Sequence, residues 1–438
     1  MSTINSRLLA KDIYQCNDTH LTGLNNNDLI IGPTGSGKTR GYVIPNLIHN
    51  SGESFVVVDT KGTLCKTYGS YLESQGYEVS CIDFVDCLRS ESGYDPIRFV
   101  GKNEQTGRYS EQDILRISAA ICPVTRKNDD PYWEQSAQMT LASLIALALE
   151  RFTEDSHSME TVCYLATRLG SDWLDELFED LAVSDYDSFA VREYRLATLS
   201  READKTIASV RGILANALNP LSFDGANHLY NAGRQVDFAS LGHHKAALFV
   251  NVSDNDGSLD RLVNVFYTQG FQELVHEADK QPQDALPVPV RFILDDFAAG
   301  TVIPDFGKTI STIRSRNIAV SLVIQDLTQL RALYGEHMGT VIANNCDTWI
   351  YLGGQDVNTA EMLSKKLNKT VDSVFDLGLD ELFLLRRASK PERATKYDLA
   401  NDRVHQVILN NLNPPTVVIT KEELEGNELF EVLERYCA

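Results

Sequence analysis

The stretch GPTGSGKT, residues 32–39, has the residue types and spacing of a phosphate-binding loop. Apolar residues 29–31 before it predict a strand, and residues 39–48 after it predict a helix, which is the setting such a loop requires. Lys38 would reach the β- and γ-phosphates of ATP, and Thr39 would offer its hydroxyl to Mg²⁺. Because a dinucleotide fingerprint would need its third glycine at Arg40, that kind of site is not favoured. The backbone N–H groups that would surround the phosphates belong to Gly32, Thr34, Gly35, Ser36 and Gly37.

A second candidate element of the same site is VRFILDDFAAG, residues 290–300. Its apolar start predicts a buried parallel strand, with Asp295 and Asp296 at the carboxyl end of that strand. Asp295 would hold Mg²⁺ through water, and Asp296 would orient or activate the attacking water. The pair also fits a plain turn after a strand. Many ATPase motors carry Glu at the second position; Asp is one methylene shorter, so water would be positioned differently here.

Further apolar runs predict more strands of one sheet, at residues 54–62, 246–254, 319–327 and 348–354. Helical stretches separate them, so we predict an α/β protein with a doubly wound, mostly parallel sheet of the P-loop, RecA-like type. Ligands bind beyond the carboxyl ends of such strands. Gln325, at the tip of the run 319–327, would therefore stand where it could sense the γ-phosphate, although a polar residue at a strand end requires no function.

The middle of the chain lacks strand patterns and favours helices. Its most regular stretch places Trp133, Ala137, Leu141, Leu144 and Ala148 on one helix face, and residues 159–169, 171–182 and 204–218 have the pattern of further amphipathic helices. We therefore predict a nucleotide-binding domain whose first part is 1–100, an all-α inserted domain at 101–232, the second part of the nucleotide-binding domain at 233–420, and an acidic helical tail at 421–438. Such an insert would bind a substrate or partner, unless it is structural elaboration.

Composition limits the class of protein. The 438 residues suffice for two or three domains, and a net charge of −21 disfavours a surface that coats nucleic acid, since such binding depends on Lys and Arg. A local basic path, such as the lumen of a ring, stays compatible with that charge. No apolar run approaches the ~18 residues that a membrane span needs, and the eight cysteines form no CxxC pair. We expect a reduced cytoplasmic protein without structural zinc.

Several blocks together resemble the coupling ATPases of type IV secretion and bacterial conjugation, over residues 25–400. The loop is followed by VVVDTKGTLC, similar to the Asp-Pro-Lys-Gly segment of that family, and DPYWEQSAQ resembles the block that opens its all-α domain. LFVNVSDNDGSLDRLVNVFYTQGFQEL resembles the family's strand and helix that precede the strand carrying the Mg²⁺-binding carboxylate. The most specific block, residues 294–367, contains an aspartate, IPDF, an Arg-bearing helix, a strand ending in Gln, LYG and an Asn-Cys-Asp turn, in that order.

The resemblance implies a motor that hydrolyses ATP to recruit DNA, or a DNA–protein complex, and move it to a transfer channel. Members of the family form rings, which implies a homo-oligomer, a hexamer, with single-stranded DNA in the lumen. The relaxase or another transferred protein would bind the all-α domain, and the type IV secretion machinery would be the partner at the channel. Ring ATPases complete each site with an arginine from the neighbouring subunit. Arg314 matches that residue best by position and Arg316 is the second candidate, the alternative being a surface salt bridge.

Three departures from the family pattern bear on function. Family members usually begin with transmembrane helices; this chain shows none, so we expect a cytoplasmic protein, alone or held at the inner face of the plasma membrane by a separate membrane partner. Asp296 stands where the family has Glu, and DTKGT replaces Asp-Pro-Lys-Gly-Glu. A competing hypothesis is therefore an ATP-binding recruitment module that delivers protein cargo without moving DNA. The basic cluster 386–396 would track phosphates in the lumen or form a solvated turn.

Overall fold

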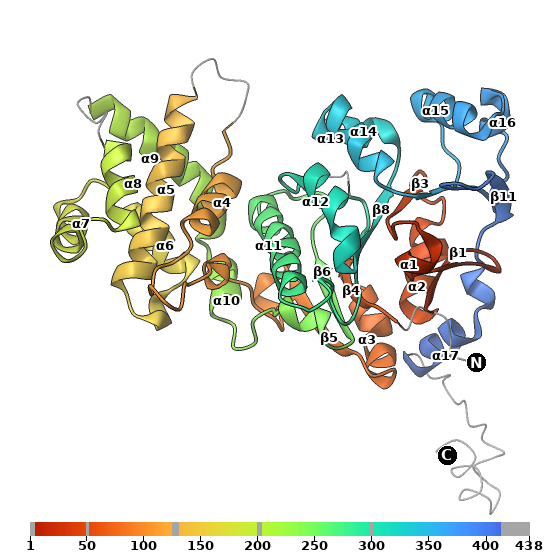
Figure 1. The fold of residues 1–438 in the computed structure, drawn as a ribbon, viewed down its shortest axis with the longest axis horizontal. Helices are drawn as coiled ribbons and strands as arrows, with labels where there is room; N and C mark the ends of the chain where they lie inside the picture. The colour runs from red at the N-terminus through yellow and green to blue at the C-terminus, as the bar shows by residue number, and fades with distance from the viewer. Residues whose placement is uncertain (1–4, 50–51, 125–130, 199–203, 298–301, 413–438) are drawn as a thin grey trace, which may run out of the picture. The chain divides into compact units, whose positions relative to one another are not determined.

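The computed structural model describes residues 5–49, 52–124, 131–198, 204–297 and 302–412. They belong to two compact units, which divide between Asp398 and Leu399. The described part of the second unit holds a 3₁₀ turn, η8 (Leu399–Asn401), and one helix, α17 (Arg403–Leu412). The first unit holds a two-stranded hairpin, a nine-stranded sheet and the helices around them (Figure 1). The acidic tail predicted at 421–438 lies outside the described residues.

The large sheet has the strand order β11-β10-β9-β3-β8-β7-β4-β6-β5. Every pairing from β9 to β5 is parallel, whereas β10 and β11 continue the sheet antiparallel beyond β9. This is the predicted doubly wound, mostly parallel sheet. Its strands are β3 (Asp28–Ile31), β4 (Ser54–Val58), β5 (Glu78–Asp83), β6 (Ala246–Asn251), β7 (Val290–Leu294), β8 (Ile318–Ile324), β9 (Thr348–Tyr351), β10 (Glu381–Arg386) and β11 (Glu392–Thr395).

The strands that the sequence predicted are those that are buried on both faces. Every residue of β3, β4, β6, β7, β8 and β9 is buried, so these strands are covered on both faces and are mostly apolar, with Asp28 and Arg291 as charged exceptions. The edge strand β5 was not predicted, and only Ile82 of its six residues is buried. The helices of this part are α1 (Thr19–Thr22), α2 (Ile44–His49), α3 (Leu64–Ser74), α11 (Asp260–Asp279), α12 (Phe306–Thr312), α13 (Leu327–Tyr334), α14 (Glu336–Asn344), α15 (Val357–Leu367) and α16 (Val371–Phe375).

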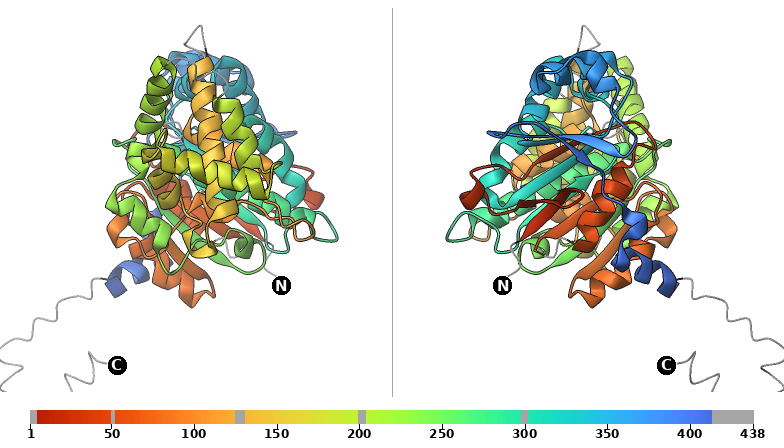
Figure 2. Two further views of the ribbon diagram at one scale, coloured as in Figure 1. Left: turned by 90° about the vertical axis from the view of Figure 1, so that its left-hand side faces the viewer. Right: turned by 90° about the vertical axis from the view of Figure 1, so that its right-hand side faces the viewer.

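Helices occupy the chain between β5 and β6, and the described residues there add no strand to the sheet. They are α4 (Glu111–Ile121), α5 (Tyr132–Arg151), α6 (Met159–Thr167), α7 (Asp172–Ser184), α8 (Phe189–Thr198), α9 (Asp204–Leu218) and α10 (Asp224–Asn231). The left panel of Figure 2 looks onto them, with α5 in orange among green helices. The sequence suggested that this helix is apolar on one face. Because α4, α6, α8 and α9 all contact α5, its residues 140–149 are instead buried on every side. The domain limits at 101 and 232 stay a prediction.

A buried ion network fixes the start of β3, the strand that leads to the phosphate-binding loop. Both Asp28 oxygens accept hydrogen bonds from Arg7, at 2.6 and 2.9 Å, and Arg7 lies on β1 (Ser6–Ala10), which pairs with β2 (Ile13–Cys16). Arg291 on β7 donates to Glu53 at 2.7 and 3.2 Å, and one of its nitrogens lies 3.5 Å from Asp28. All four side chains are buried, so the network ties the hairpin, β3 and β7 together away from water.

The Asn-Cys-Asp turn before β9 also holds β3. Asp347 accepts a hydrogen bond from the backbone N–H of Asn25 at 2.6 Å, and the carbonyl of Asn345 accepts from the side chains of Asn25 and Asn27 at 3.0 Å each. The turn therefore fixes the approach to β3, which is a structural role for a block that the sequence singled out. None of the described helices is both long and apolar enough to cross a bilayer.

Candidate active site

The phosphate-binding loop connects β3 to a helical segment that opens as a π-helical turn, η1 (Thr39–Val43), and continues as α2. Two glycines there have left-handed backbone angles, with φ of +81° at Gly35 and +94° at Gly37. Gly32 is needed for space, because a Cβ on it would lie 2.4 Å from the Ser36 hydroxyl and 3.0 Å from the Cβ of Leu352. The predicted strand, loop and helix are therefore present, and glycine is required at three positions.

Three polar side chains of the loop bear on whether it could hold a magnesium nucleotide. The Lys38 ammonium is buried and donates to the carbonyls of Gly32 and Pro33, at 2.7 and 3.3 Å. The Thr39 hydroxyl donates to the Asp295 carboxylate at 2.7 Å, across 256 positions of sequence. Ser36 has a buried hydroxyl that finds no hydrogen-bond partner in the described part of the chain. A hydroxyl beside a carboxylate suits Mg²⁺, and an unpaired hydroxyl in a glycine cradle suits a phosphate oxygen.

Asp295 and Asp296 follow β7 directly, as the sequence predicted. Burial raises the pKa of the Asp295 carboxyl, the hydrogen bond from Thr39 opposes that shift, and the neighbouring charge of Asp296 adds to it. A bound cation would reverse this balance and favour the ionised carboxylate. Asp296 has φ +51°, in the left-handed region where Asp and Asn are several-fold enriched among non-glycine residues. The backbone thus gives a physical reason for Asp at a position where Glu was the expectation from the family.

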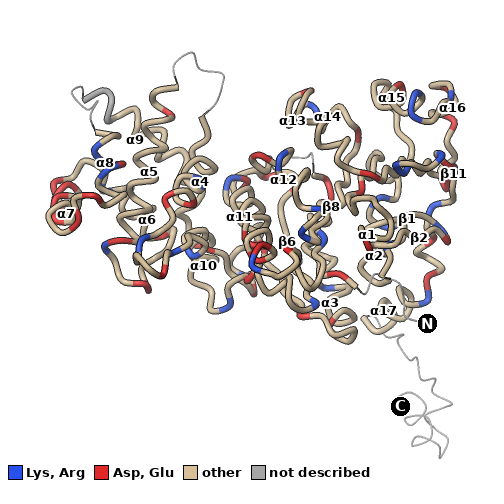
Figure 3. Tube along the Cα trace, viewed as in Figure 1, with Lys and Arg blue, Asp and Glu red and all other residues tan. Residues whose placement is uncertain are grey.

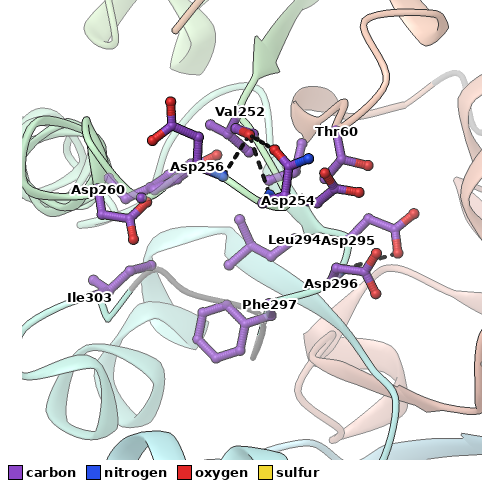
Figure 4. A pocket seen from close by; sticks show the side chains of 15 residues that line it. Thr60, Val252, Asp254, Asp256, Asp260, Leu294, Asp295, Asp296, Phe297 and Ile303 are labelled. Carbon is purple, nitrogen blue, oxygen red and sulfur yellow. Dashed lines mark hydrogen bonds between the residues drawn. The ribbon is translucent and has the colours of Figure 1, made fainter. Parts of the chain in front are cut away.

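A cavity of about 200 Å³ lies beside these two carboxylates (Figure 4). Thr60 and Asp254 line it near Asp295, and Asp256 and Asp260 line it further away, on the loop after β6 and at the start of α11. Asp296 is itself one of the residues that line this cavity, and its role in positioning water stays a prediction. These lining residues could not be placed from the sequence, because the pairing of β6 with β4 brings them to this edge.

Gln325 stands next to the loop because β8 lies between β3 and β7 in the sheet. The backbone N–H of Gly32 donates to the carbonyl of Ile324 at 3.1 Å, so the residue after Ile324 begins beside the base of the loop. The Gln325 side chain accepts a hydrogen bond from Gln329 at 3.3 Å. The backbone therefore places Gln325 next to the phosphate-binding loop, and its role as a γ-phosphate sensor stays a prediction.

Arg314 and Arg316 lie in a 3₁₀ turn, η7 (Ile313–Arg316), immediately before β8. Because β8 and β3 are parallel, this turn is at the amino edge of the sheet and the phosphate-binding loop is at the carboxyl edge. The seven residues of β8 separate the two edges by ~20 Å. Arg316 pairs with Asp279 at 2.8 Å, whereas Arg314 is exposed and forms no ion pair within the described residues. Neither arginine reaches the loop of its own chain, so either could act only on another subunit.

Two other sequence features have structural partners. Asp59 of the DTKG segment is buried and accepts from the backbone N–H groups of residues 63, 64 and 65, so it caps α3. In the cluster 386–396, which forms the end of β10, a turn and β11, three arginines pair with carboxylates. These pairs are Arg386 with Glu392, Arg387 with Asp347 and Arg393 with Glu381. Lys396 was not singled out as a site residue, and it reaches the phosphate-binding loop.

Together, the fold and the site define a class of protein: a RecA-like P-loop nucleotide-binding protein, with one strand between the loop strand and the carboxylate strand. A family model for the conjugative DNA transfer component of the type IV secretory system matches residues 4–374, and the chain belongs to that family. The resemblance found in the sequence is thereby confirmed. No curated protein sequence matches the chain significantly.

Solved structures of one conjugative coupling protein are similar to this chain. The unbound monoclinic form of TrwBdeltaN70 has a TM-score of 0.66 at 16% identity, with 91% of this chain and 89% of that chain covered. TrwB in complex with the ATP analogue ADPNP has a TM-score of 0.63 at 17% identity, and TrwB with ADP and Mg²⁺ has 0.62 at 17%; each covers 85% of both chains. At these identities the likeness concerns the fold.

Proposed function

We propose that this protein is a coupling ATPase of conjugative DNA transfer, which binds and hydrolyses Mg-ATP to bring DNA, or a DNA–protein complex, to a type IV secretion channel. The observation that carries the proposal is the hydrogen bond of Thr39 to Asp295, because it joins the two halves of a P-loop magnesium site. Membership of the conjugative DNA transfer family supplies the process that the hydrolysis would drive.

Each site residue has a role in this proposal. Lys38 holds the β- and γ-phosphates while Thr39 and, through water, Asp295 hold Mg²⁺, which neutralises charge that develops on the phosphates. Asp296 orients the attacking water and accepts its proton from the side that faces the cavity. Gln325 senses whether the γ-phosphate is present. Hydrolysis would then change the contacts at the carboxyl edge of the sheet.

We further propose a ring of identical subunits, a hexamer, in which Arg314 of one subunit completes the site of the next. Support comes from the exposure of Arg314 at the amino edge, opposite the loop of its own chain. A head-to-tail interface brings one such edge to the opposite edge of a neighbour and closes into a ring. Single-stranded DNA would pass through the lumen, and hydrolysis in successive subunits would move it.

The helices α4 to α10 would receive the protein cargo, such as the relaxase, and a membrane partner would keep the ring at the inner face of the plasma membrane. Charge supports a division of labour between the parts. Helix α7 carries five acidic residues and no basic one, and Figure 3 shows them gathered there. DNA phosphates are repelled from such a surface, so we expect DNA at the sheet-containing part of each subunit.

The test is ATP turnover by the purified chain, with and without single-stranded DNA, beside Lys38→Ala. Turnover that rises with DNA and disappears in the variant is expected. Turnover that ignores DNA and responds instead to a transferred protein would replace the motor with a recruitment module. Absence of ATP binding in the unmodified chain would overturn the proposal altogether.

A further inference from the structure

A lysine from the far end of the sheet contacts the phosphate-binding loop. The Lys396 ammonium donates to the carbonyl of Ser36 at 2.9 Å and to the carbonyl of Leu352 at 3.0 Å. Lys396 follows β11, the last strand among the described residues, and lies 360 positions from Ser36 in sequence. The contact therefore exists only because the β10–β11 hairpin folds back toward the loop.

The position of Lys396 is fixed by its surroundings. Its backbone N–H donates to the carbonyl of Asp380 at 2.7 Å, and the next residue, Tyr397, shares a hydrogen bond of 3.2 Å with His49 at the end of α2. The side chain is half-buried, and this burial lowers the pKa of its ammonium. A lysine held at both its backbone and its tip differs from the flexible surface lysines that dominate most proteins.

The bonded carbonyl belongs to a peptide that matters for phosphate binding. No described peptide bond is cis, so the carbonyl of Ser36 and the N–H of Gly37 point in opposite directions from the same planar unit. Holding that carbonyl fixes the direction of the Gly37 N–H, one of the groups predicted to surround the phosphates. Gly37 has φ +94°, one of the many conformations open to glycine, so a contact that holds the preceding carbonyl restricts this freedom.

Lys396 also differs from its basic neighbours in what its side-chain nitrogen contacts. The three arginines of the same hairpin pair with carboxylates, whereas Lys396 donates to neutral main-chain carbonyls. A cation bound to a carbonyl oxygen polarises the peptide and strengthens the N–H on its other side as a donor. Its positive potential adds to that of Lys38 without contact with a carboxylate in the described part of the chain.

We propose that Lys396 is a positioning residue of the nucleotide site, which orients the Ser36–Gly37 peptide so that the loop binds the phosphates of ATP. This inference rests on the proposed function, because it assumes that the loop binds ATP. It differs from a purely structural role in its kinetic signature. A residue that preorganises the loop for the substrate and the transition state alike raises KM when it is lost and leaves kcat nearly unchanged.

The experiment compares Lys396→Met, which keeps the stem without the charge, with Lys396→Arg, which keeps the charge. Lys390→Ala is the matched control, because Lys390 is an exposed cation in the same hairpin. Binding of a fluorescent ATP analogue with Mg²⁺, kcat, KM and the unfolding temperature are measured for each. We expect Lys396→Met to weaken ATP binding about tenfold, with a matching rise in KM, and Lys396→Arg to restore most of the affinity.

Two results would overturn the inference while leaving the proposed function in place. One is ATP binding by Lys396→Met that equals that of the unmodified chain. The other is a fall in kcat at constant KM together with a lower unfolding temperature, the pattern of partial loss of folded protein. If the unmodified chain and Lys390→Ala both fail to bind the ATP analogue, the proposed function itself fails, and this inference fails with it.

Discussion

Asp296 shows at the residue scale how backbone conformation selects a side chain. Its left-handed φ of +51° is tolerated by Asp and Asn, and other L-residues lose roughly 1–2 kcal/mol there. Replacement by the family's Glu would therefore add a methylene at the cost of strain. Asn keeps both the shape and the backbone preference of Asp and removes only the charge, so it isolates the proposed role in water activation.

We predict that Asp296→Asn lowers ATP turnover by about 100-fold or more while ATP binding is retained, because a positioned base contributes roughly 10²–10⁴-fold. Turnover and binding of an ATP analogue are the measurements. Asp305→Asn is the control, since Asp305 is also left-handed, with φ +54°, and lies outside the cavity lining. Unchanged turnover in Asp296→Asn would remove Asp296 from the mechanism.

Asp295 yields a second residue-scale prediction, for the protein without nucleotide. Burial raises the pKa of this carboxyl in the folded protein above its value in the unfolded chain. Its ionisation therefore lowers the free energy of unfolding as pH rises from the unfolded pKa to the folded pKa. Asp295→Asn is therefore expected to raise the unfolding temperature at pH 7.5 and to abolish Mg-ATP binding. An unfolding temperature of Asp295→Asn at or below that of the unmodified chain would show that the ionised Asp295 carboxylate does not destabilise the folded protein.

Elements in the fold are joined by buried charges, and the network around β3 is the clearest case. Arg291→Met would remove the two hydrogen bonds that Arg291 donates to Glu53 and would take a positive charge away from Asp28. We expect a loss of about 3–5 kcal/mol in the free energy of unfolding, as is found when one partner of a buried pair is removed. Urea denaturation measures it.

The control for that prediction is Arg234→Ala, which breaks an exposed pair with Glu78. Exposed pairs contribute roughly 0–1 kcal/mol, so this variant should unfold almost as the unmodified chain does. Equal effects of the two substitutions would mean that the buried network does not hold β3 to its neighbours.

The connection between the sheet and the helices gives a pH-dependent prediction at the same scale. Asp95 is fully buried beside 3₁₀ turn η3 (Pro96–Phe99) and accepts from the backbone N–H groups of Ile97 and of Met159, the first residue of α6. Burial raises its pKa from 3.8 to about 7. The folded state thus binds the proton more tightly than the unfolded state, and stability falls as pH rises from about 4 to 7.

We predict that Asp95→Asn makes the free energy of unfolding less dependent on pH in this range. The unmodified chain should lose more unfolding free energy between pH 5 and pH 8 than the variant does, by at most about 3 kcal/mol. Urea midpoints at the two pH values measure the difference, and other titrating groups cancel in the comparison. Parallel profiles would show that Asp95 stays ionised in the folded protein.

At the scale of the whole molecule, the separation of Arg314 from its own loop predicts complementation between subunits. Arg314→Ala and Lys38→Ala should each be inactive alone, and their mixture should recover part of the DNA-stimulated turnover. Recovery arises where an intact loop of one chain meets an intact Arg314 of the other. Arg316→Ala is the companion variant, because its pairing with Asp279 predicts a milder effect. Mixed assemblies without recovery would exclude a role in trans.

The sequence by itself determined the nucleotide site and the fold class. Gly32, Lys38, Thr39 and Asp295 were recognisable because phosphates and Mg²⁺ constrain residue type and spacing along a short stretch of chain. The central strands were recognisable because both of their faces are buried, which demands continuous apolar runs. These constraints act on residues that are adjacent in sequence, so a short stretch of sequence reveals them.

Only the tertiary structure decided which distant residues meet at that site. The contact of Lys396 with Ser36, the acidic lining from the β6–α11 loop, and the distance of Arg314 from its own loop all follow from strand order. The edge strands β5 and β11 were missed, as was β10 beside β11, and the β10–β11 hairpin was noticed only as a basic cluster. Pairings across hundreds of positions depend on the summed burial of the whole sheet, so no single segment of the sequence specifies them.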